Sequence, residues 1–159
     1  MRILTGAEAQ RPAAQLLREY LAEVAARLDD YDSGGPGAEA EAADGSMIVC
    51  CADDGTPLGC LAVRPIAPGV AELKRMYVRP AARGTGLGSR LLGVAEDAAR
   101  ALGCHTLRLD TAAPLVEALR LYRRHGYTEI PRYNDNPAAT HWLEKVLAGS
   151  GLRASGWRQ

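Results

Sequence analysis

The stretch MYVRPAARGTGLGSRLLGVAEDAARALG, Met76–Gly103, decides the fold, because it joins an apolar strand to an amphipathic helix through a glycine-rich turn. Gly84, Gly86 and Gly88 alternate directly before the helix. Glycine adopts backbone angles closed to other residues and lets a ligand approach the chain. The start of a helix also presents unpaired N–H groups and the positive end of the helix dipole. The turn therefore predicts a phosphate site, with a plain tight turn as the alternative.

Two other phosphate-binding patterns do not fit this turn. The Walker pattern requires lysine and then serine or threonine after its last glycine, whereas Ser89 and Arg90 follow Gly88 here. The dinucleotide fingerprint requires glycine or alanine at the position of Ser89 and follows the first strand of a βαβ unit. Here the turn follows a run of antiparallel strands.

Composition indicates an ordinary globular domain. The chain has 159 residues, of which 47% are hydrophobic and 24% charged. Lys+Arg and Asp+Glu both count 19, so the charge balance favours neither nucleic acid nor an anionic membrane as a partner. No stretch approaches the roughly 20 apolar residues of a membrane span, and the N-terminus lacks the apolar segment of a signal peptide. We therefore expect a cytoplasmic protein.

The cysteines and histidines do not have the spacing of a metal site. Cys50 and Cys51 are adjacent, whereas Cys60 and Cys104 stand alone, and no CxxC pair occurs. We expect buried strand thiols and no metal, with a redox or metal role as the alternative.

Hydrophobic periodicity predicts an α/β protein of the α+β type, with a mixed sheet and helices on its faces. Helical structure is expected to begin at Thr5 or nearby. Helical spacing marks Pro12 to about Asp30, Leu87–Leu102 and Leu115–Tyr122, and Asp54 with Gly55 predicts a hairpin. The expected strands are Arg2–Leu4, Met47–Asp53, Pro57–Ile66, Val70–Val78, Thr106–Thr111, Tyr127–Ile130 and Thr140–Leu147.

Three local features qualify this outline. Lys74 and Arg75 are neighbours on one strand, so a bulge or a polar cleft is expected there. The small, acidic segment Ser33–Gly45 reads as a mobile loop. We expect residues 1–148 to form a single domain and residues 149–159 a flexible tail.

Two segments resemble the GNAT family of N-acetyltransferases. RGTGLG, Arg83–Gly88, is similar to that family's Arg/Gln-x-x-Gly-x-Gly/Ala motif, and ALRLYRRHGY, Ala118–Tyr127, resembles its Leu-Tyr segment. The strand ELKRMYVRP resembles the family's fourth strand. The resemblance covers the order of elements from about Met1 to Leu147. It implies the GNAT fold, a central, mainly antiparallel twisted sheet with helices on both faces. Its fourth and fifth strands, Val70–Val78 and Thr106–Thr111 here, would splay apart.

The resemblance implies acetyl-CoA, or a related acyl-CoA, as the acyl donor. Its pyrophosphate would lie on the backbone amides that follow Arg83, and its pantetheine arm would pair with the fourth strand as an added strand does. The donor-binding residues implied are Met76, Tyr77, Val78, Arg83, Gly84, Thr85, Gly86, Leu87, Gly88 and Ser89.

Two residues are candidates for acid–base catalysis. Glu72 precedes Arg83 at the spacing of a catalytic glutamate in the family's histone-acetylating branch, which implies a general base. A substrate-binding role or a carboxylate paired with Lys74 is the alternative. Tyr122 matches the family's Leu-Tyr segment, which implies an acid that protonates the coenzyme sulfur, although its periodicity alone favours a core residue. With an unperturbed pKa of about 10, a tyrosine is protonated at neutral pH.

The acceptor is an amine of unassigned identity. Lys74, Arg75, Arg132 and Tyr133 are candidates to bind a carboxylate on an amino-acid-like amine, whereas the acidic segment Ser33–Gly45 favours cationic amines. We expect an enzyme that acetylates a small-molecule amine by direct transfer in a ternary complex. The alternatives are a protein lysine or N-terminal acetyltransferase and a non-catalytic acyl-CoA-binding module. The alternation in THWLEKVL also favours a homodimer.

Overall fold

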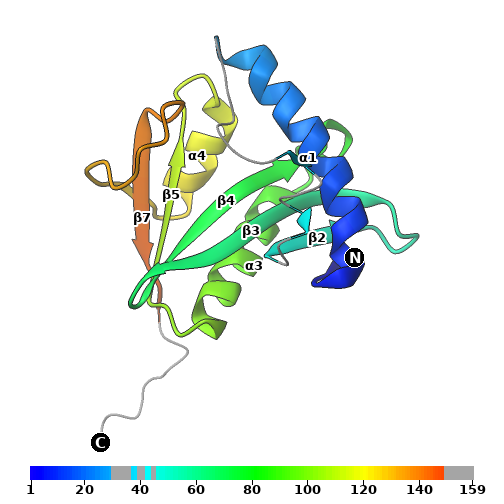
Figure 1. Ribbon diagram of the computed structural model, residues 1–159, viewed down its shortest axis with the longest axis horizontal. Helices are drawn as coiled ribbons and strands as arrows, with labels where there is room; N and C mark the ends of the chain where they lie inside the picture. The colour runs from blue at the N-terminus through cyan, green and yellow to red at the C-terminus, as the bar shows by residue number, and fades with distance from the viewer. Residues whose placement is uncertain (30–36, 39–41, 44–45, 149–159) are drawn as a thin grey trace, which may run out of the picture.

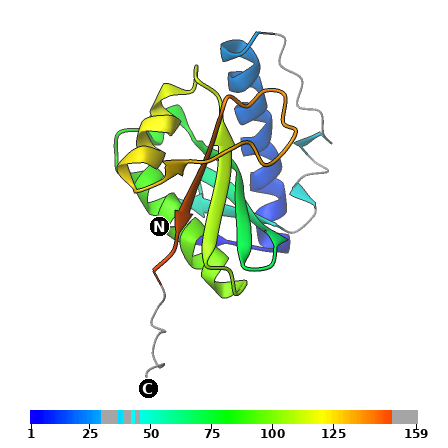
Figure 2. The same ribbon diagram turned by 90° about the vertical axis from the view of Figure 1, so that its left-hand side faces the viewer.

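A seven-stranded sheet separates the helices of the computed structural model into two layers (Figures 1 and 2). The structure describes residues 1–29, 37–38, 42–43 and 46–148. Its strands are β1 (Arg2–Leu4), β2 (Met47–Cys51), β3 (Pro57–Ala67), β4 (Val70–Val78), β5 (Thr106–Thr111), β6 (Thr128–Glu129) and β7 (His141–Val146). Its helices are α1 (Ala7–Arg27), the short 3-10 helix η1 (Pro80–Ala82), α3 (Leu87–Ala101) and α4 (Val116–Arg124).

The sheet is mixed and mainly antiparallel, as expected. Its strand order is β1-β2-β3-β4-β5-β7-β6, and β4 with β5 is the parallel pair. These two strands pair only from Val70 opposite Thr106 to Glu72 opposite Arg108. Beyond that point they part, which Figure 1 shows as a widening gap between their ends. The predicted splay of the fourth and fifth strands is therefore confirmed.

Two hydrophobic cores cover the two faces of the sheet. α3 and α4 pack on one face, where Leu91 and Leu107 are fully buried, and α1 packs on the other over Val49 and Cys60. Helices on both faces are thus confirmed (Figure 2). The cysteines are free and buried, as predicted, and burial raises the pKa of Cys60 to about 12.

A β-bulge interrupts β4 at the pair of neighbouring charges. Cys60 on β3 lies opposite Tyr77 and Ala62 lies opposite Lys74, so Arg75 and Met76 together face one residue of β3. Arg75 takes a left-handed backbone conformation, with φ at 56°. The bulge takes up the extra residue of β4, so that Leu73 before it and Tyr77 after it point into the cores on opposite faces of the sheet. The bulge predicted from the charge pair is confirmed.

The helix boundaries follow the expected signals with one difference. Gly103 and Gly126, both with positive φ, directly follow the caps of α3 and α4, where backbone amides bond back to Ala99 and Tyr122. α1 begins at Ala7, close to the expected start near Thr5, and it ends at Arg27, before the expected end near Asp30. Most of the segment Ser33–Gly45 and the expected tail 149–159 lie outside the described residues. None of the helices in the described ranges is long and apolar enough to cross a bilayer.

Candidate active site

A cleft of about 770 Å³ opens where β4 and β5 part. Its walls come from these strands, the end of α1, the glycine turn before α3, the helix α4 and residues 134–139. The structure brings most of the predicted site residues together here. Those that line the cleft are Glu72, Lys74, Arg75, Met76, Tyr77, Val78, Arg83, Gly84, Gly86, Gly88, Ser89 and Tyr122.

Four predicted residues lie outside the walls of this cleft. Thr85 and Leu87 line a separate hollow on the other side of the glycine turn, so only their backbone groups are candidates for contact with a donor. Arg132 stacks on the ring of Trp142, with 5.4 Å between the guanidinium carbon and the ring centroid. Tyr133 reaches the cleft indirectly, through a hydrogen bond to Glu72.

The glycine turn has the form of an anion cradle. Gly84 and Gly86 have φ values of 77° and 86°, and a Cβ added at either position would meet no atom within 4 Å. No acidic residue stands in the first turn of α3, and the backbone N–H of Arg90 donates to the carbonyl of Gly86 at 3.2 Å. The open backbone and the unpaired amides at the helix start therefore fit a pyrophosphate.

Arg83 ties the glycine turn to α1. Its Nη2 donates to Oε1 of Glu23 at 2.7 Å, and its Nε donates to the carbonyl of Val78 at 2.9 Å. The guanidinium also lies over the ring of Tyr77. Arg83 lines the cleft, but its charge is already paired with a carboxylate.

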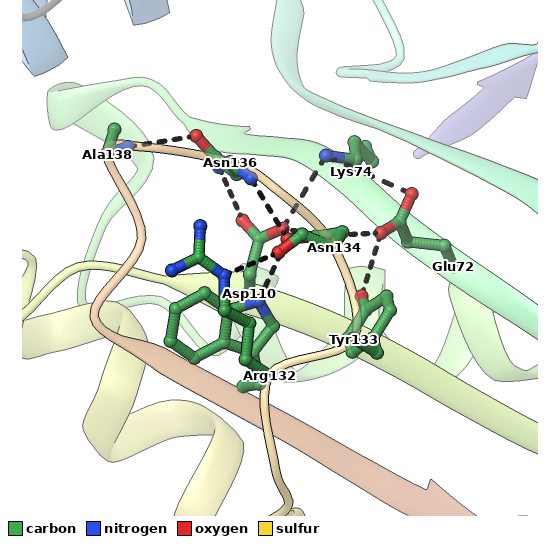
Figure 3. Close-up of polar contacts among 9 residues, drawn as sticks. Glu72, Lys74, Asp110, Arg132, Tyr133, Asn134, Asn136 and Ala138 are labelled. Atoms are coloured by element: carbon green, nitrogen blue, oxygen red, sulfur yellow. Dashed lines mark hydrogen bonds and ion pairs between the residues drawn. The ribbon is translucent and has the colours of Figure 1, made fainter.

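Glu72 is a buried carboxylate with one oxygen left for chemistry (Figure 3). Its Oε2 accepts hydrogen bonds from the hydroxyl of Tyr133 at 2.7 Å and from Nδ2 of Asn134 at 3.2 Å. Its Oε1 lies 3.9 Å from Nζ of Lys74 and accepts no hydrogen bond within the described residues. Oε1 is therefore the atom positioned to accept a proton. Burial and the bond to Glu72 raise the pKa of Tyr133, so its hydroxyl remains a donor at neutral pH.

The side chain of Asn134 fixes this arrangement. Its Oδ1 accepts hydrogen bonds from Nε1 of Trp142 at 2.9 Å and from the backbone N–H of Asn136 at 3.2 Å. Since both donors require an oxygen at that position, the amide nitrogen must point to the other side. There it donates to Glu72 and, at 2.7 Å, to Oδ2 of Asp110.

Asp110 is a site residue that sequence reasoning missed. It lies on β5 beyond the last β4–β5 pair, and its Oδ1 accepts a hydrogen bond from Nδ2 of Asn136 at 2.9 Å. Nζ of Lys74 lies 3.6 Å from its Oδ2 (Figure 3). Neither Asp110 nor the two asparagines belongs to a sequence motif.

Tyr122 places a buried hydroxyl on the opposite wall. The residue is 7% exposed, and its ring packs edge-on against that of Tyr127 at 6.0 Å between centroids. Burial raises its pKa above the ordinary tyrosine value, so the hydroxyl carries its proton at neutral pH. Its hydroxyl has no hydrogen-bond partner among the residues that the structure describes, which leaves it available to a ligand.

An ion pair joins the two helices that border the cleft. Arg27, near the end of α1, makes two hydrogen bonds of 2.9 Å to the carboxylate of Glu117 on α4 and a third, of 3.0 Å, to the carbonyl of Pro114.

Across the ranges described, no group of three or more histidine, cysteine, aspartate or glutamate side chains has the arrangement of a metal site.

Comparison with known proteins yields one consistent family. Residues 11–127 match the model of the acetyltransferase (GNAT) family. An N-acetyltransferase of Schizosaccharomyces pombe without an assigned substrate is 37% identical over 127 residues, which cover 77% of this chain and 78% of that protein. The IAA acetyltransferase of Azospirillum brasilense is 42% identical over 97 residues, covering 58% of this chain and 63% of that enzyme.

Two further likenesses bear on chemistry and fold. An aminoglycoside N(6')-acetyltransferase type 1 of Stenotrophomonas maltophilia is 31% identical over 98 residues, covering 57% of this chain and 64% of that enzyme. A solved structure assigned as an acyl-CoA N-acyltransferase of Klebsiella pneumoniae superposes with a TM-score of 0.70 at 30% identity, covering 92% of this chain and 97% of that one.

Proposed function

This chain is an acyltransferase that belongs to the acetyltransferase (GNAT) family, and from that premise we propose that it transfers an acetyl group from acetyl-CoA to a primary amine of a small molecule. One observation carries the proposal. A single cleft joins a glycine turn that fits a pyrophosphate to a buried carboxylate and a buried phenol. Both substrates are then bound together, and the acetyl group passes directly between them.

The donor lies along the parted strands in this proposal. Its pyrophosphate accepts hydrogen bonds from the backbone amides that follow Arg83, where Gly84 and Gly86 leave the chain uncovered. Beyond Glu72 the described part of β4 has no strand partner on the β5 side, so its backbone is available to the pantetheine arm. Met76 and Val78 supply these groups, since both line the cleft.

Glu72 acts as the base. Most aliphatic amines arrive as ammonium ions, which have no lone pair for attack. Oε1 of Glu72 takes one proton, directly or through a water molecule, while Tyr133 and Asn134 hold Oε2 in place. The freed amine nitrogen then forms a bond to the thioester carbonyl carbon, and the carbon–sulfur bond breaks when the tetrahedral intermediate collapses.

Tyr122 acts as the acid. The sulfur leaves as a thiolate and takes the phenolic proton. The nitrogen of the intermediate gives its second proton to the Tyr122 phenolate as the amide forms, and Glu72 releases its proton to solvent. The products are the acetamide and CoA with a free thiol, and one proton is released overall. Burial raises the pKa of Tyr122, so its hydroxyl carries a proton at neutral pH and can hydrogen-bond to the departing sulfur. A free thiol pKa of about 8.5 makes the thiolate a fair leaving group, so the help from Tyr122 is partial.

A small acceptor is supported by the size of the cleft and by one relative. The volume of about 770 Å³ lies within the roughly 300–1,000 Å³ of small-molecule sites, and the pantetheine arm takes part of it. The aminoglycoside acetyltransferase among the relatives acts on a small amine by its name. Lys74 and Arg75 both line the cleft, beside the place proposed for the acceptor. A homodimer and a cytoplasmic location remain part of the proposal.

Product analysis with a broad amine panel tests this function. The protein is incubated with acetyl-CoA and with amino acids, polyamines, aminoglycosides, aromatic amines and lysine peptides, while thiol release and product mass are followed. We expect acetylated product with a small amine and none with the peptides. Product from peptides alone would establish a protein acetyltransferase. Acetyl-CoA binding without any acetylated product would indicate a non-catalytic acyl-CoA module.

A further inference from the structure

The acceptor end of the cleft, which we define as Glu72, Lys74, Arg75, Asp110 and residues 134–139, holds two buried carboxylates that one amide bridges. Glu72 and Asp110 lie on neighbouring strands where β4 and β5 part, and Nδ2 of Asn134 donates to both. Their side chains are only 9% and 10% exposed. Burying two like charges so close together is costly unless a cation is present.

Lys74 supplies that cation without making a close contact. Its Nζ lies 3.9 Å from Glu72 and 3.6 Å from Asp110, and both distances exceed those of a normal hydrogen bond (Figure 3). Within the described residues, no other cation forms an ion pair with either carboxylate. The ammonium of Lys74 therefore marks a position where a positive charge is favoured. A cation in closer contact with the two carboxylates can be accommodated there.

The charge of the acceptor end leads to the same conclusion. The acceptor end carries three carboxylates, those of Glu72, Asp110 and Asp135, and two basic side chains, those of Lys74 and Arg75, so its formal charge is one negative. The hydroxyl of Tyr122 is a separate sign that this cleft receives a ligand, because it is 7% exposed and has no partner within the described residues. Binding one ammonium ion would neutralise the excess.

We infer that Asp110 is a specificity-determining residue, which together with Glu72 binds the acceptor as an ammonium ion and so selects aliphatic amines over uncharged ones. This inference rests on the proposed function. The two carboxylates divide the work. Glu72 has an oxygen without a hydrogen bond from the described residues and takes the proton, whereas Asp110, whose two oxygens already accept amide hydrogen bonds, holds the amine. The favoured acceptor is therefore a primary aliphatic amine, which is largely ammonium at neutral pH.

Cyclohexylamine and aniline form a matched pair of probes. Both present an amino group on a six-carbon ring, but at neutral pH the first is an ammonium ion and the second is uncharged. Calorimetry measures each affinity on protein saturated with CoA, so no turnover is needed. We expect the wild type to bind cyclohexylamine at least tenfold more tightly than aniline. Asp110→Asn should abolish this preference and leave the aniline affinity within about twofold, because the substitution removes the charge and keeps the shape, although one of the two amide hydrogen bonds is lost with it.

The control is Asp97→Asn, which removes the same charge from an 81% exposed side chain on α3. It should retain the preference. Equal weakening of both probes in Asp110→Asn would mean that Asp110 only supports the loop, and it would overturn the inference. A preference that survives in Asp110→Asn, or a wild type that binds neither probe or favours aniline, would overturn it as well. Failure of the proposed function would instead appear as the absence of acetylated product in the amine panel, whatever the two probes do.

Discussion

Replacing Tyr122 by phenylalanine should make the protein more stable and less active at once. The tyrosine is 7% exposed and its hydroxyl has no hydrogen-bond partner in the described part of the chain. A buried hydroxyl without a partner costs about 1–3 kcal/mol, so its removal should raise the free energy of unfolding by about 1 kcal/mol. For a chain of this length that corresponds to an increase in Tm of about 2–4 °C. Turnover should fall roughly ten- to a thousandfold, because the thiolate loses its proton donor.

Tyr127 offers a matched control for this substitution. Its ring packs against that of Tyr122, but its hydroxyl donates to Oε2 of the buried Glu96 at 2.9 Å. Tyr127→Phe removes that bond and should lower the free energy of unfolding by about 1–3 kcal/mol. Because Tyr127 does not line the cleft, its variant should keep wild-type turnover below its Tm. The two substitutions should thus change stability and turnover in different ways.

Thermal unfolding and steady-state kinetics with saturating donor and acceptor test this pair. A burst experiment must first establish that chemistry limits the rate. Near-normal turnover in Tyr122→Phe would refute the acid role, because the thiolate would then leave without help. A fall in Tm like that of Tyr127→Phe would refute the structural premise, since it would mean that the hydroxyl of Tyr122 has a partner in the folded protein.

Other substitutions and solution measurements test the remaining parts of the site. Glu72→Gln should lose activity where the acceptor is mainly ammonium and recover as the pH approaches the amine's own pKa, and a pH–rate profile with unchanged shape would contradict the base role. Gly86→Val should lower donor affinity in calorimetry at least tenfold, whereas Gly55→Val, which imposes similar strain at φ 92° in a hairpin remote from the cleft, should not. Light scattering should give the mass of a homodimer, and a monomer at high concentration would remove that part of the proposal. Alkaline unfolding should begin above about pH 10, because burial raises the pKa of Tyr122 and Tyr127, so the unfolded chain loses these protons first.

Local signals predicted most of the fold. The hairpin at Gly55, the bulge beside Lys74 and the helix stops at Gly103 and Gly126 each depend on a few consecutive residues, and the structure bears them out. The end of α1 was less accurate. The helical spacing of apolar residues includes Leu28 and predicted an end near Asp30, yet the helix ends at Arg27.

The acceptor end was not predictable in the same way. Asn134 meets Glu72 across 62 positions of sequence and Asp110 across 24, so the fold of the loop alone brings these side chains together. Arg83 is a similar case, because its partner Glu23 lies 60 positions earlier on α1. Side-chain networks of this kind have no periodic pattern, and they become visible only when the strands and the loop are placed in space.

The bulge in β4 has a consequence for insertions and deletions in this chain. Arg75 is the residue added opposite β3, so a chain without it would pair Met76 directly with Leu61 and keep a regular alternation. Leu73 and Tyr77 would then still point into their separate cores. Loss of one codon at this position should therefore be tolerated by the fold, whereas the same loss elsewhere in β4 would exchange the inner and outer faces of the residues that follow. The shortened strand would lose the bend that accompanies a bulge, and with it part of the divergence from β5 that opens the cleft.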